Sequence, residues 1–488
     1  MFDILTEKNR NRIAIFICFL FLLVYSSIAL VNHYCFRTNA LDMGYFLKAI
    51  YDFSLLRFHD FSISQMEMNC IFADHFNPSL IIIAPLRFIF GSYTLSILQI
   101  AFILLGAWGT YVFIRERSPY VWLPVLGLIH FGLMWGNFEA LAYDFHDSIP
   151  GAMLLPWLLH FFLKKKWTAV VPLFLFMLGW KETMGVWIVF VAAGIGMLHP
   201  MEKEIRRAAI LMGAFGFLWA MVATQIIIPS FDYTGRNYRH FDYGVLGDNP
   251  VDVVQTLVTH PGFAFKLIYT DHISSPFWWD LKKEMLLVFF AAGGLLLFLR
   301  PAFFLMAVPI ILQKVWADDP AKWGLIWHYG IEFVPVVSIG IYWMFMQIRN
   351  RSLAYALAVL SIAANLTATC YVFTYRKPIY KIQETRKFYK ASHYRQPFSV
   401  RLAHEAMRLI PDSASVSATQ TALPHLALRK NIYLFPDTAN ADFIFAIDYW
   451  QAYPISYNEL AIRLYNLKNN PEWEMLFGEE NIYVFRRK

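Results

Sequence analysis

Side chains that could do chemistry gather at a few places in an otherwise apolar chain. Asp42 stands in the segment ALDMGYFLKAIYDF, whose apolar residues have a helical spacing that would lay it on a membrane surface. A carboxylate there can reach a lipid headgroup, or it can cap a helix, a position that Asp favours. Further on, IFADHFNPSL contains Asp74 and His75. Such a pair can bind a metal or share a proton, although Asn77 and Pro78 also resemble an ordinary helix start.

A lysine and a glutamate stand side by side between two apolar runs, as Lys181 and Glu182 in LFMLGWKETMGVWIVF. Adjacent opposite charges could neutralise each other at the tip of a helical hairpin. Alternatively, the lysine could act as a point charge that holds a phosphate at the outer leaflet. The residues alone support both interpretations equally.

Two further segments combine acids with histidines. The stretch FEALAYDFHDSIP (138–150) contains Glu139, Asp144, His146 and Asp147. It could be a solvated acidic turn, and its spacing matches no strong metal signature. The stretch WHYGIEFVP (327–335) contains His328, Tyr329 and Glu332. A glutamate buried there needs a partner, and no nucleophile elbow, zinc-protease, phosphate-loop or Cys-x-x-Cys motif occurs in the sequence.

Membrane-spanning helices are the elements that must position these groups. The chain is 58% hydrophobic and 16% charged, whereas soluble proteins carry about 25% charged residues. This composition excludes a disordered chain and a disulfide-stapled mini-domain, and the net charge of +7 fits short basic loops better than a nucleic-acid partner. Apolar runs predict eleven spans, near 13–31, 93–114, 119–136, 149–163, 167–181, 183–198, 206–229, 284–299, 301–315, 331–348 and 352–374.

Basic residues in the short loops predict the orientation. Six clusters fall on one side of the eleven spans: Lys8, Arg10 and Arg12; Arg115 and Arg117; Lys164 to Lys166; Lys203, Arg206 and Arg207; Arg300; Arg349 and Arg351. By the positive-inside rule the N-terminus is cytoplasmic, and the long first outer loop, 32–92, and the C-terminus lie outside. The apolar stretch 78–90 is too short to span, so we expect an interfacial helix there.

The last part of the chain, 376–488, is polar and predicts a small α/β domain outside the membrane, after a transmembrane domain over 1–375. We expect helices at 378–391, 398–410 and 456–468, and strands at 414–419, 431–435, 442–447 and 481–485. Cys35 and Cys70 share the first outer loop and could form a disulfide if that loop faces an oxidising compartment.

Several segments, in order, resemble one family. The strings DMGYF, FADHFNPSLIIIAPL, DFHDSIPGAML, GWKETMGVWI, WHYGIEFVP and SVSATQTALPHLALRKNIYLFP resemble a bacterial membrane-protein family of unknown function that is grouped with the GT-C glycosyltransferases. That superfamily includes protein O-mannosyltransferases and aminoarabinose transferases. The resemblance covers most of the chain, and it implies an all-α polytopic membrane domain with an extracytoplasmic α/β domain.

The resemblance also implies a function. Enzymes of this superfamily move a sugar from a polyprenyl-phosphate donor to a glycan, lipid or protein acceptor on the outer face of the membrane, usually with inversion. Carried over to this chain, the resemblance assigns Asp42 as the base. We also expect Asp74 to be catalytic, Lys181, His75 and His328 to hold the donor phosphate, and Glu182, His146 and Tyr329 to line the cavity. Many relatives have paired acids, but Met43 follows Asp42 here, so the need for a divalent cation stays open.

Two functions of other classes compete with this one. A lipid or solute transporter, such as a flippase, would need charges along a path through the bilayer, whereas the middle of most spans is apolar. If the chain were a noncatalytic envelope scaffold, deletion of 376–488 would abolish its function, whereas substitution of Asp42 would have no effect.

Overall fold

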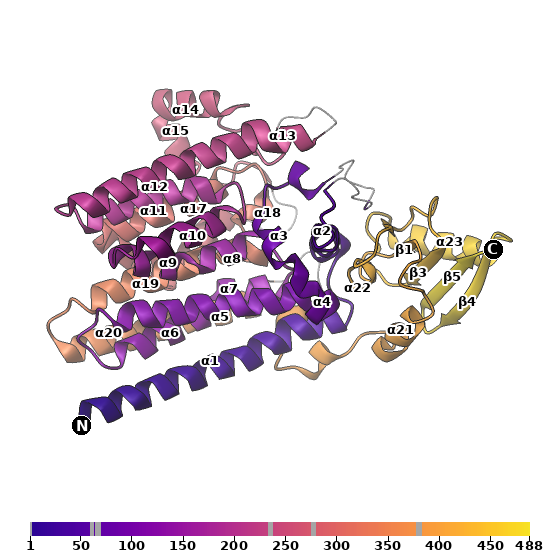
Figure 1. Cartoon of the computed structure of the whole chain (residues 1–488), viewed down its shortest axis with the longest axis horizontal. Coiled ribbons are helices and arrows are strands. Elements are labelled where there is room, and N and C mark those ends of the chain that lie inside the picture. The colour runs from indigo at the N-terminus through magenta and orange to yellow at the C-terminus, as the bar shows by residue number, and fades with distance from the viewer. Residues whose placement is uncertain (1, 59–62, 64–69, 233–237, 275–279, 377–382) are drawn as a thin grey trace.

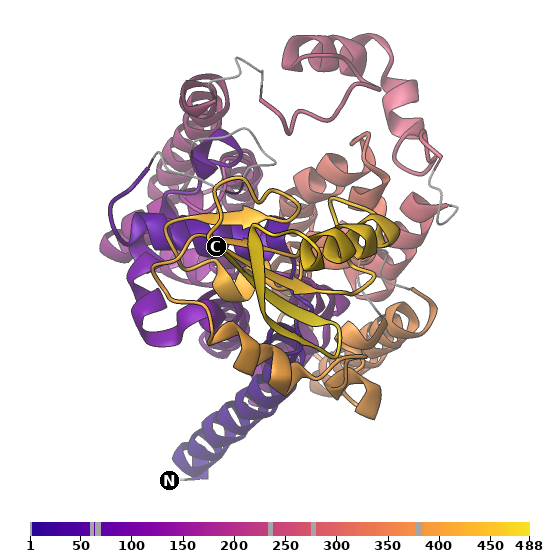
Figure 2. The same ribbon diagram turned by 90° about the vertical axis from the view of Figure 1, so that its right-hand side faces the viewer.

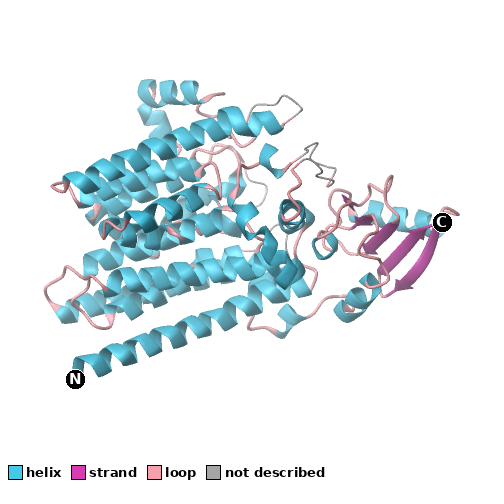
Figure 3. Ribbon diagram, viewed as in Figure 1, coloured by secondary structure: helices cyan, strands magenta, loops and turns pink. Residues whose placement is uncertain are grey.

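The computed structural model has a long bundle of helices with a small sheet domain at one end (Figures 1 and 3). It describes the chain except for residues 1, 59–62, 64–69, 233–237, 275–279 and 377–382. The helices of the bundle are α1 (Phe2–Tyr34), α5 (Thr94–Arg115), α6 (Leu123–Leu133), α7 (Trp135–Ala142), α8 (Ser148–Met153), α9 (Leu155–Leu163), α10 (Trp167–Leu178), α11 (Met184–Leu198), α12 (Lys203–Val222), α16 (Leu281–Ala291), α17 (Pro301–Val315), α19 (Phe333–Phe345) and α20 (Arg351–Tyr375).

The helices identify a membrane-embedded protein, but they do not establish eleven crossings. Among the described residues, four helices are long and apolar enough to span: Glu7–Tyr34, Ser79–Arg115, Lys203–Phe231 and Arg351–Tyr375. The number rises to six if two bent helix pairs each count as one span, and four shorter apolar helices remain. Two of these four helices, Ser148–Leu163 and Pro301–Val315, begin within two residues of a proline. The eleven crossings therefore stay a prediction.

Close helix packing holds the bundle together. Helices α11 and α12 meet through Gly185 and Gly216, and a Cβ at Gly185 would collide with the carbonyl oxygen of Gly216. Small residues let two backbones approach closely inside a membrane, where dispersion replaces the hydrophobic effect as the main attraction. The opposite faces carry exposed apolar side chains, such as Phe16 on α1 and Ile210 on α12, as expected for contact with lipid.

Short helical segments form the end of the bundle next to the sheet domain. They comprise a π turn (Ala40–Gly44), α2 (Tyr45–Phe53), a 3-10 turn (Ile71–Ala73), α3 (Ser79–Ile83), a 3-10 turn (Ala84–Leu86), α4 (Arg87–Phe90) and a 3-10 turn (Gly91–Tyr93). A second group comprises α13 (Ile228–Phe231), α14 (Pro250–Thr259), α15 (Pro261–Lys266), α18 (Pro320–Trp323) and a 3-10 turn (Trp327–Gly330). The expected single helix at 78–90 is divided, with Pro85 inside the 3-10 turn that separates α3 from α4.

Helix α2 does not lie on a membrane surface as its apolar spacing predicted. Almost all of its side chains are buried, in a core that it shares with the sheet domain. Leu423 of that domain packs against Gly44, so closely that a Cβ at Gly44 would collide with it. The apolar spacing of α2 thus reflects contact with protein, which a helical period alone cannot distinguish from contact with lipid.

The sheet domain has five strands in the order β2-β1-β3-β5-β4. Figure 2 shows this domain from the end of the molecule. Strands β1 (Val416–Ala418), β2 (Ile432–Leu434) and β3 (Phe443–Ile447) are parallel, and β5 (Ile482–Arg487) runs antiparallel to β3. Helices α21 (Val400–Met407), α22 (Leu423–Leu426) and α23 (Tyr457–Lys468) accompany the sheet. The four expected strands and the helix at 456–468 are confirmed.

The domain differs from the expectation in three places. Strand β4 (Trp473–Glu479) was not predicted, because WEMLFGE lacks a regular alternation and contains a β-bulge between Met475 and Phe477. The helix expected at 378–391 lies partly outside the described residues, and the rest contains 3-10 turns at Gln383–Arg386 and Ala391–Tyr394. The helix expected at 398–410 is shorter, as α21.

The segment 383–395, after α20, connects the sheet domain to the bundle through hydrogen bonds and an ion pair. The Arg386 guanidinium donates to the Glu139 carboxylate at 2.5 Å, and both side chains are almost fully buried. Arg37, after α1, donates to the carbonyl oxygens of His393 at 2.5 Å and Arg395 at 2.6 Å. Cys35 and Cys70 are free thiols, so the disulfide considered from the sequence is absent from the structure.

Candidate active site

One cavity of about 700 Å³ lies at the end of the bundle next to the sheet domain. Its walls come from the π turn and α2, the pair Asp74 and His75 before α3, the loop after α7, the α10–α11 hairpin, α12 and the segments near 238–243 and 327–332. All eight residues singled out from the sequence line it: Asp42, Asp74, His75, His146, Lys181, Glu182, His328 and Tyr329. The fold therefore gathers groups that are up to 287 positions apart in the chain (42 to 329).

The π turn Ala40–Gly44 presents Asp42 to the cavity. Asp42 is not a helix N-cap, because the turn begins after Asn39 and Asp42 is its third residue. The Tyr143 hydroxyl donates to Asp42 Oδ2 at 2.9 Å, and the Asn39 amide donates to Asp144 Oδ2 at 2.9 Å. Tyr143 and Asp144 lie next to each other after α7, so this loop fixes both the turn and its carboxylate.

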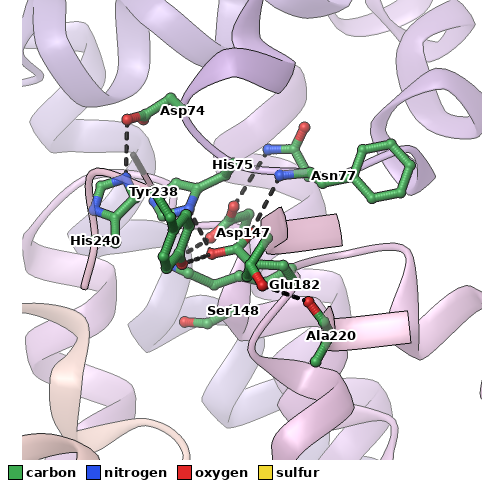
Figure 4. A network of polar contacts seen from close by, with 12 residues as sticks. Asp74, His75, Asn77, Asp147, Ser148, Glu182, Ala220, Tyr238 and His240 are labelled. Carbon is green, nitrogen blue, oxygen red and sulfur yellow. Dashed lines mark hydrogen bonds and ion pairs between the residues drawn. The ribbon is translucent and has the colours of Figure 1, made fainter. Parts of the chain in front are cut away.

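Glu182 is the centre of a buried hydrogen-bond network (Figure 4). Its carboxylate accepts from His75 Nδ1 at 3.0 Å, from the Phe76 amide at 3.2 Å and from the Tyr238 hydroxyl. Burial alone would raise the pKa of Glu182, but the His75 charge and hydrogen bond, with Lys181, lower it to about 2. Burial and Lys181 would lower the pKa of His75, but Glu182, Asp147 and Asp74 outweigh them and raise it. Both shifts favour the charged forms of the pair, an imidazolium and a carboxylate.

Lys181 does not pair with its neighbour in the chain. Its Nζ lies 3.2 Å from Asp147 Oδ1 and 3.5 Å from His146 Nε2, while Asn77 Nδ2 donates to Asp147 Oδ2 at 3.2 Å. Burial would lower the pKa of Lys181, but Asp147 and Glu182 raise it, so the ammonium stays charged. Lys181 and Glu182 favour each other's charged form, but they make no direct ion pair among the described residues, and the contacts of each are with other elements.

Asp74, His75 and His240 form the group best suited to a metal. One potential ligand atom from each lies within 4.8 Å of the other two. His240 Nε2 contacts Asp74 Oδ1 at 2.9 Å, and the His240 ring stacks on His75 with centroids 4.0 Å apart. One carboxylate and two imidazoles suit zinc and similar divalent cations. A cation would have to displace the proton of His75, which links metal binding to pH.

Two stacked imidazoles form another wall of the cavity. His146 and His328 have ring centroids 3.5 Å apart and an interplanar angle of 14°. Burial, with His328 and Lys181, lowers the pKa of His146 well below its usual range, so this ring is neutral. Both ring nitrogens of His328 are buried and have no hydrogen-bond partner among the described residues. Tyr329 lies beside His328, with ring centroids 4.2 Å apart.

The other acids found in the sequence have structural partners. Glu332 accepts from Lys314 Nζ at 2.7 Å in the cavity wall, which supplies the partner that a buried glutamate needs. Glu139 lies outside the cavity and pairs with Arg386. Since Asp144 and Asp147 are also buried, residues 138–150 are not a solvated turn.

Several cavity and network residues were not proposed from the sequence as site residues, among them Tyr143, Asp147, Tyr238 and His240. Asp147 was visible in the acidic cluster, but its partner Lys181 is 34 positions away. Tyr238 and His240 lie in NYRHFDYG, a polar stretch with no periodicity or motif. Only the folded chain brings this stretch to Asp74 and Glu182.

Comparisons with known proteins agree on a membrane family. A family model described as "Predicted membrane protein (DUF2079)" matches residues 32–473. A search of curated proteins gives no match to this chain. The fold resembles ArnT from Cupriavidus metallidurans in the apo state, with a TM-score of 0.51, 11% identity and 98% of each chain covered. ArnT bound to undecaprenyl phosphate gives 0.49 and 10% identity, with 96% of this chain and 97% of that chain covered. The resemblance seen in the sequence is thereby confirmed at the level of family and fold.

Proposed function

The chain belongs to the DUF2079 family of predicted membrane proteins, and from this premise we propose that it is a membrane glycosyltransferase that uses a polyprenyl-phosphate-linked donor. The proposal rests on one observation. The Asp42 carboxylate and the Lys181 ammonium line the same cavity, at one end of an apolar helix bundle. The fold shared with apo ArnT supports it, because that protein is a membrane protein of the same architecture.

The apolar flank of the cavity supports a lipid donor. Val186, Phe217 and Met221 line the cavity, yet they are 45%, 58% and 42% exposed at the outside of the bundle. A cavity that is polar inside and opens on an exposed apolar surface suits a molecule with a polar head and a hydrocarbon tail. We therefore extend to this chain the class of lipid that ArnT holds in one of its structures, undecaprenyl phosphate.

The side chains in the cavity fit glycosyl transfer. The Asp42 carboxylate takes the proton from an acceptor hydroxyl, whose oxygen forms a bond to the anomeric carbon of the donor sugar. The bond between that carbon and the phosphate oxygen breaks, and its electron pair leaves with the lipid phosphate. The Lys181 ammonium offsets the charge that develops there, as an electrostatic stabiliser that is already in place. A single displacement of this kind inverts the anomeric centre.

Other residues complete the proposal. Asp74 is the alternative carboxylate, and His75 and His328 stand where they can contact the donor phosphate or sugar. Glu182, His146 and Tyr329 shape the cavity, and Asp74, His75 and His240 could hold a divalent cation that would add positive charge near the phosphate. We propose that the acceptor is a glycan, lipid or protein of the cell envelope, and that the cavity faces the outer side of a bacterial cytoplasmic membrane, the orientation that the basic loops favour.

A genetic comparison tests the proposed function. Cell-envelope glycans, lipids and proteins would be analysed in a deletion strain, in the same strain expressing the parent chain, and in the strain expressing Asp42→Asn. We expect one sugar modification to disappear on deletion, to return with the parent chain and to stay absent with Asp42→Asn. Envelopes that have the same sugar composition in all three strains would contradict the proposal.

A further inference from the structure

A second, shallower groove lies on the sheet domain, separate from the cavity. It has a volume of about 490 Å³ and runs between the end of α21 and α22. Two arginines line it, Arg408 and Arg429, together with one acid, Asp412. None of these residues lines the cavity that contains Asp42. The groove therefore carries a net positive charge that the proposed sugar transfer does not use.

Arg429 is held rigidly at the bottom of the groove and is only 6% exposed. Its Nε donates to the Leu426 carbonyl oxygen at 2.8 Å, and its Nη1 donates to the carbonyl oxygens of Pro411 and Ala414 at 3.2 and 3.1 Å. In the described part of the chain no hydrogen bond is found from Nη2, which is also not closed off from solvent. Burial lowers the pKa of Arg429 to about 10, so the guanidinium stays charged at neutral pH. Its fixed geometry is suited to an anion.

Arg408 supplies a second cation at the rim. Its side chain is exposed and has no hydrogen bond or ion pair among the residues that the structure describes. Asp412, also exposed, is the opposing charge in the groove. Two guanidinium groups, one buried and one exposed, against a single carboxylate favour a ligand with at least one negative charge and several oxygens.

The groove lies beside the end of a membrane helix. His404 of α21 donates from Nε2 to the carbonyl oxygen of Tyr34, the last residue of α1, at 3.0 Å. His425 of α22 stacks on His33 of α1, with ring centroids 4.2 Å apart. His33 in turn contacts Ser92 Oγ at 3.0 Å, directly after α4. Figure 1 shows α4, α21, α22 and the end of α1 meeting where the bundle joins the sheet domain.

Helix α4 places an apolar surface next to this junction. Phe88, Ile89 and Phe90 are 66%, 71% and 37% exposed. Exposed aromatic and aliphatic side chains next to cations, at the end of a membrane helix, are typical of the boundary between the acyl chains and the headgroups of a bilayer. A ligand in the groove would stand at the level of the lipid headgroups.

We propose that the groove formed by Arg408, Arg429 and α22 binds a phosphate-type anion, of the class that the headgroups of anionic phospholipids carry. Arg429 binds one phosphate oxygen through Nη2, and Arg408 closes over the anion from the rim. The acyl chains of the lipid extend along α4. The site anchors the sheet domain to the membrane surface and does not depend on the function of the cavity.

The test measures binding of short-chain phosphatidylglycerol to the purified full chain in detergent, from the shift of its thermal unfolding midpoint. Phosphatidylcholine of the same chain length and inorganic phosphate are the comparison ligands. We expect phosphatidylglycerol to bind at least about tenfold more tightly than phosphatidylcholine. Arg408→Ala should weaken phosphatidylglycerol binding about tenfold, the usual effect of losing one charged hydrogen bond.

A control variant distinguishes binding in this groove from binding elsewhere on the chain. Arg401 lies on α21, is exposed, faces Glu405 at 3.6 Å and does not line the groove, so Arg401→Ala should bind phosphatidylglycerol like the parent chain. If inorganic phosphate protects the parent chain and loses this effect in Arg408→Ala, the site is supported with a soluble anion as its ligand. Equal binding by the parent and Arg408→Ala, or an equal loss in Arg401→Ala, would overturn the proposal.

Discussion

Replacing Lys181 with methionine should weaken the binding of polyprenyl phosphate by about 10- to 100-fold. The substitution keeps the length of the side chain and removes its charge. At an effective dielectric constant of 20, two unit charges 4 Å apart attract by about 4 kcal/mol. Asp147 already lies 3.2 Å from Nζ and offsets part of this attraction. A charged hydrogen bond of about 1.5–3 kcal/mol is therefore the better measure, since Lys181 is only 11% exposed. At 1.4 kcal/mol per factor of ten, this energy gives the stated range.

The assay is titration of the purified chain with polyprenyl phosphate, followed by calorimetry. Lys166→Met is the matched control, because Lys166 is an exposed lysine at the start of α10 that does not line the cavity. A double variant, Lys181→Met with Asp147→Asn, tests the alternative that Lys181 only neutralises Asp147. If the double variant binds the lipid as well as the parent chain, or if Lys181→Met alone has no effect, the assignment of Lys181 to the phosphate is refuted.

Three further predictions concern stability and topology. Arg386→Met should destabilise the chain by about 3–5 kcal/mol, because it leaves the Glu139 carboxylate buried without its cation, and adding Glu139→Gln should recover part of the loss of thermal midpoint. The pKa of His75 is raised above 6.5 and that of Glu182 is lowered from 4.5 to about 2, so their mutual stabilisation should be largest between pH 4.5 and 6.5. This stabilisation should decrease as the pH rises through the folded-state pKa of His75, and also as the pH falls toward 2. If the difference in thermal unfolding midpoint between the parent chain and His75→Gln does not vary with pH, the prediction is contradicted. A reporter enzyme that is active only outside the cytoplasm, fused after Arg376, should give signal, whereas signal from a cytoplasmic reporter there would reverse the orientation.

Much of the helical framework could be predicted because long apolar runs leave few alternatives. The run 13–31 lies within α1, and the run 352–374 lies within α20. The number of crossings could not be predicted, since hydropathy does not show where a proline ends a helix or where two short helices meet at an angle. The pair α6 and α7 is bent by 40°, and the segments Pro320–Gly330 and Phe333–Phe345 are bent by 70°.

The sequence could predict those site residues that are charged and stand in an apolar segment. It could not predict which side chains of other segments pair with them. Asp42, Lys181 and Glu182 were visible because charges are costly near a membrane. Their partners were not, because a side chain such as Tyr143 or His240 is ordinary until the fold brings it to a carboxylate. Apolar spacing was misleading for α2, whose buried face packs against the sheet domain.

The most direct test of the central claim is the rate of sugar transfer by Asp42→Asn. Asparagine can still accept the hydrogen bond that Tyr143 donates to Asp42 at 2.9 Å, but it cannot take a proton at neutral pH. Transfer from a polyprenyl-phosphate donor to the envelope acceptor would be measured in membranes that contain equal amounts of the parent chain, Asp42→Asn or Asp74→Asn. We predict that Asp42→Asn binds the donor normally and transfers about 100-fold more slowly or worse. Normal transfer by Asp42→Asn, with loss of transfer in Asp74→Asn, would contradict the assignment of the base.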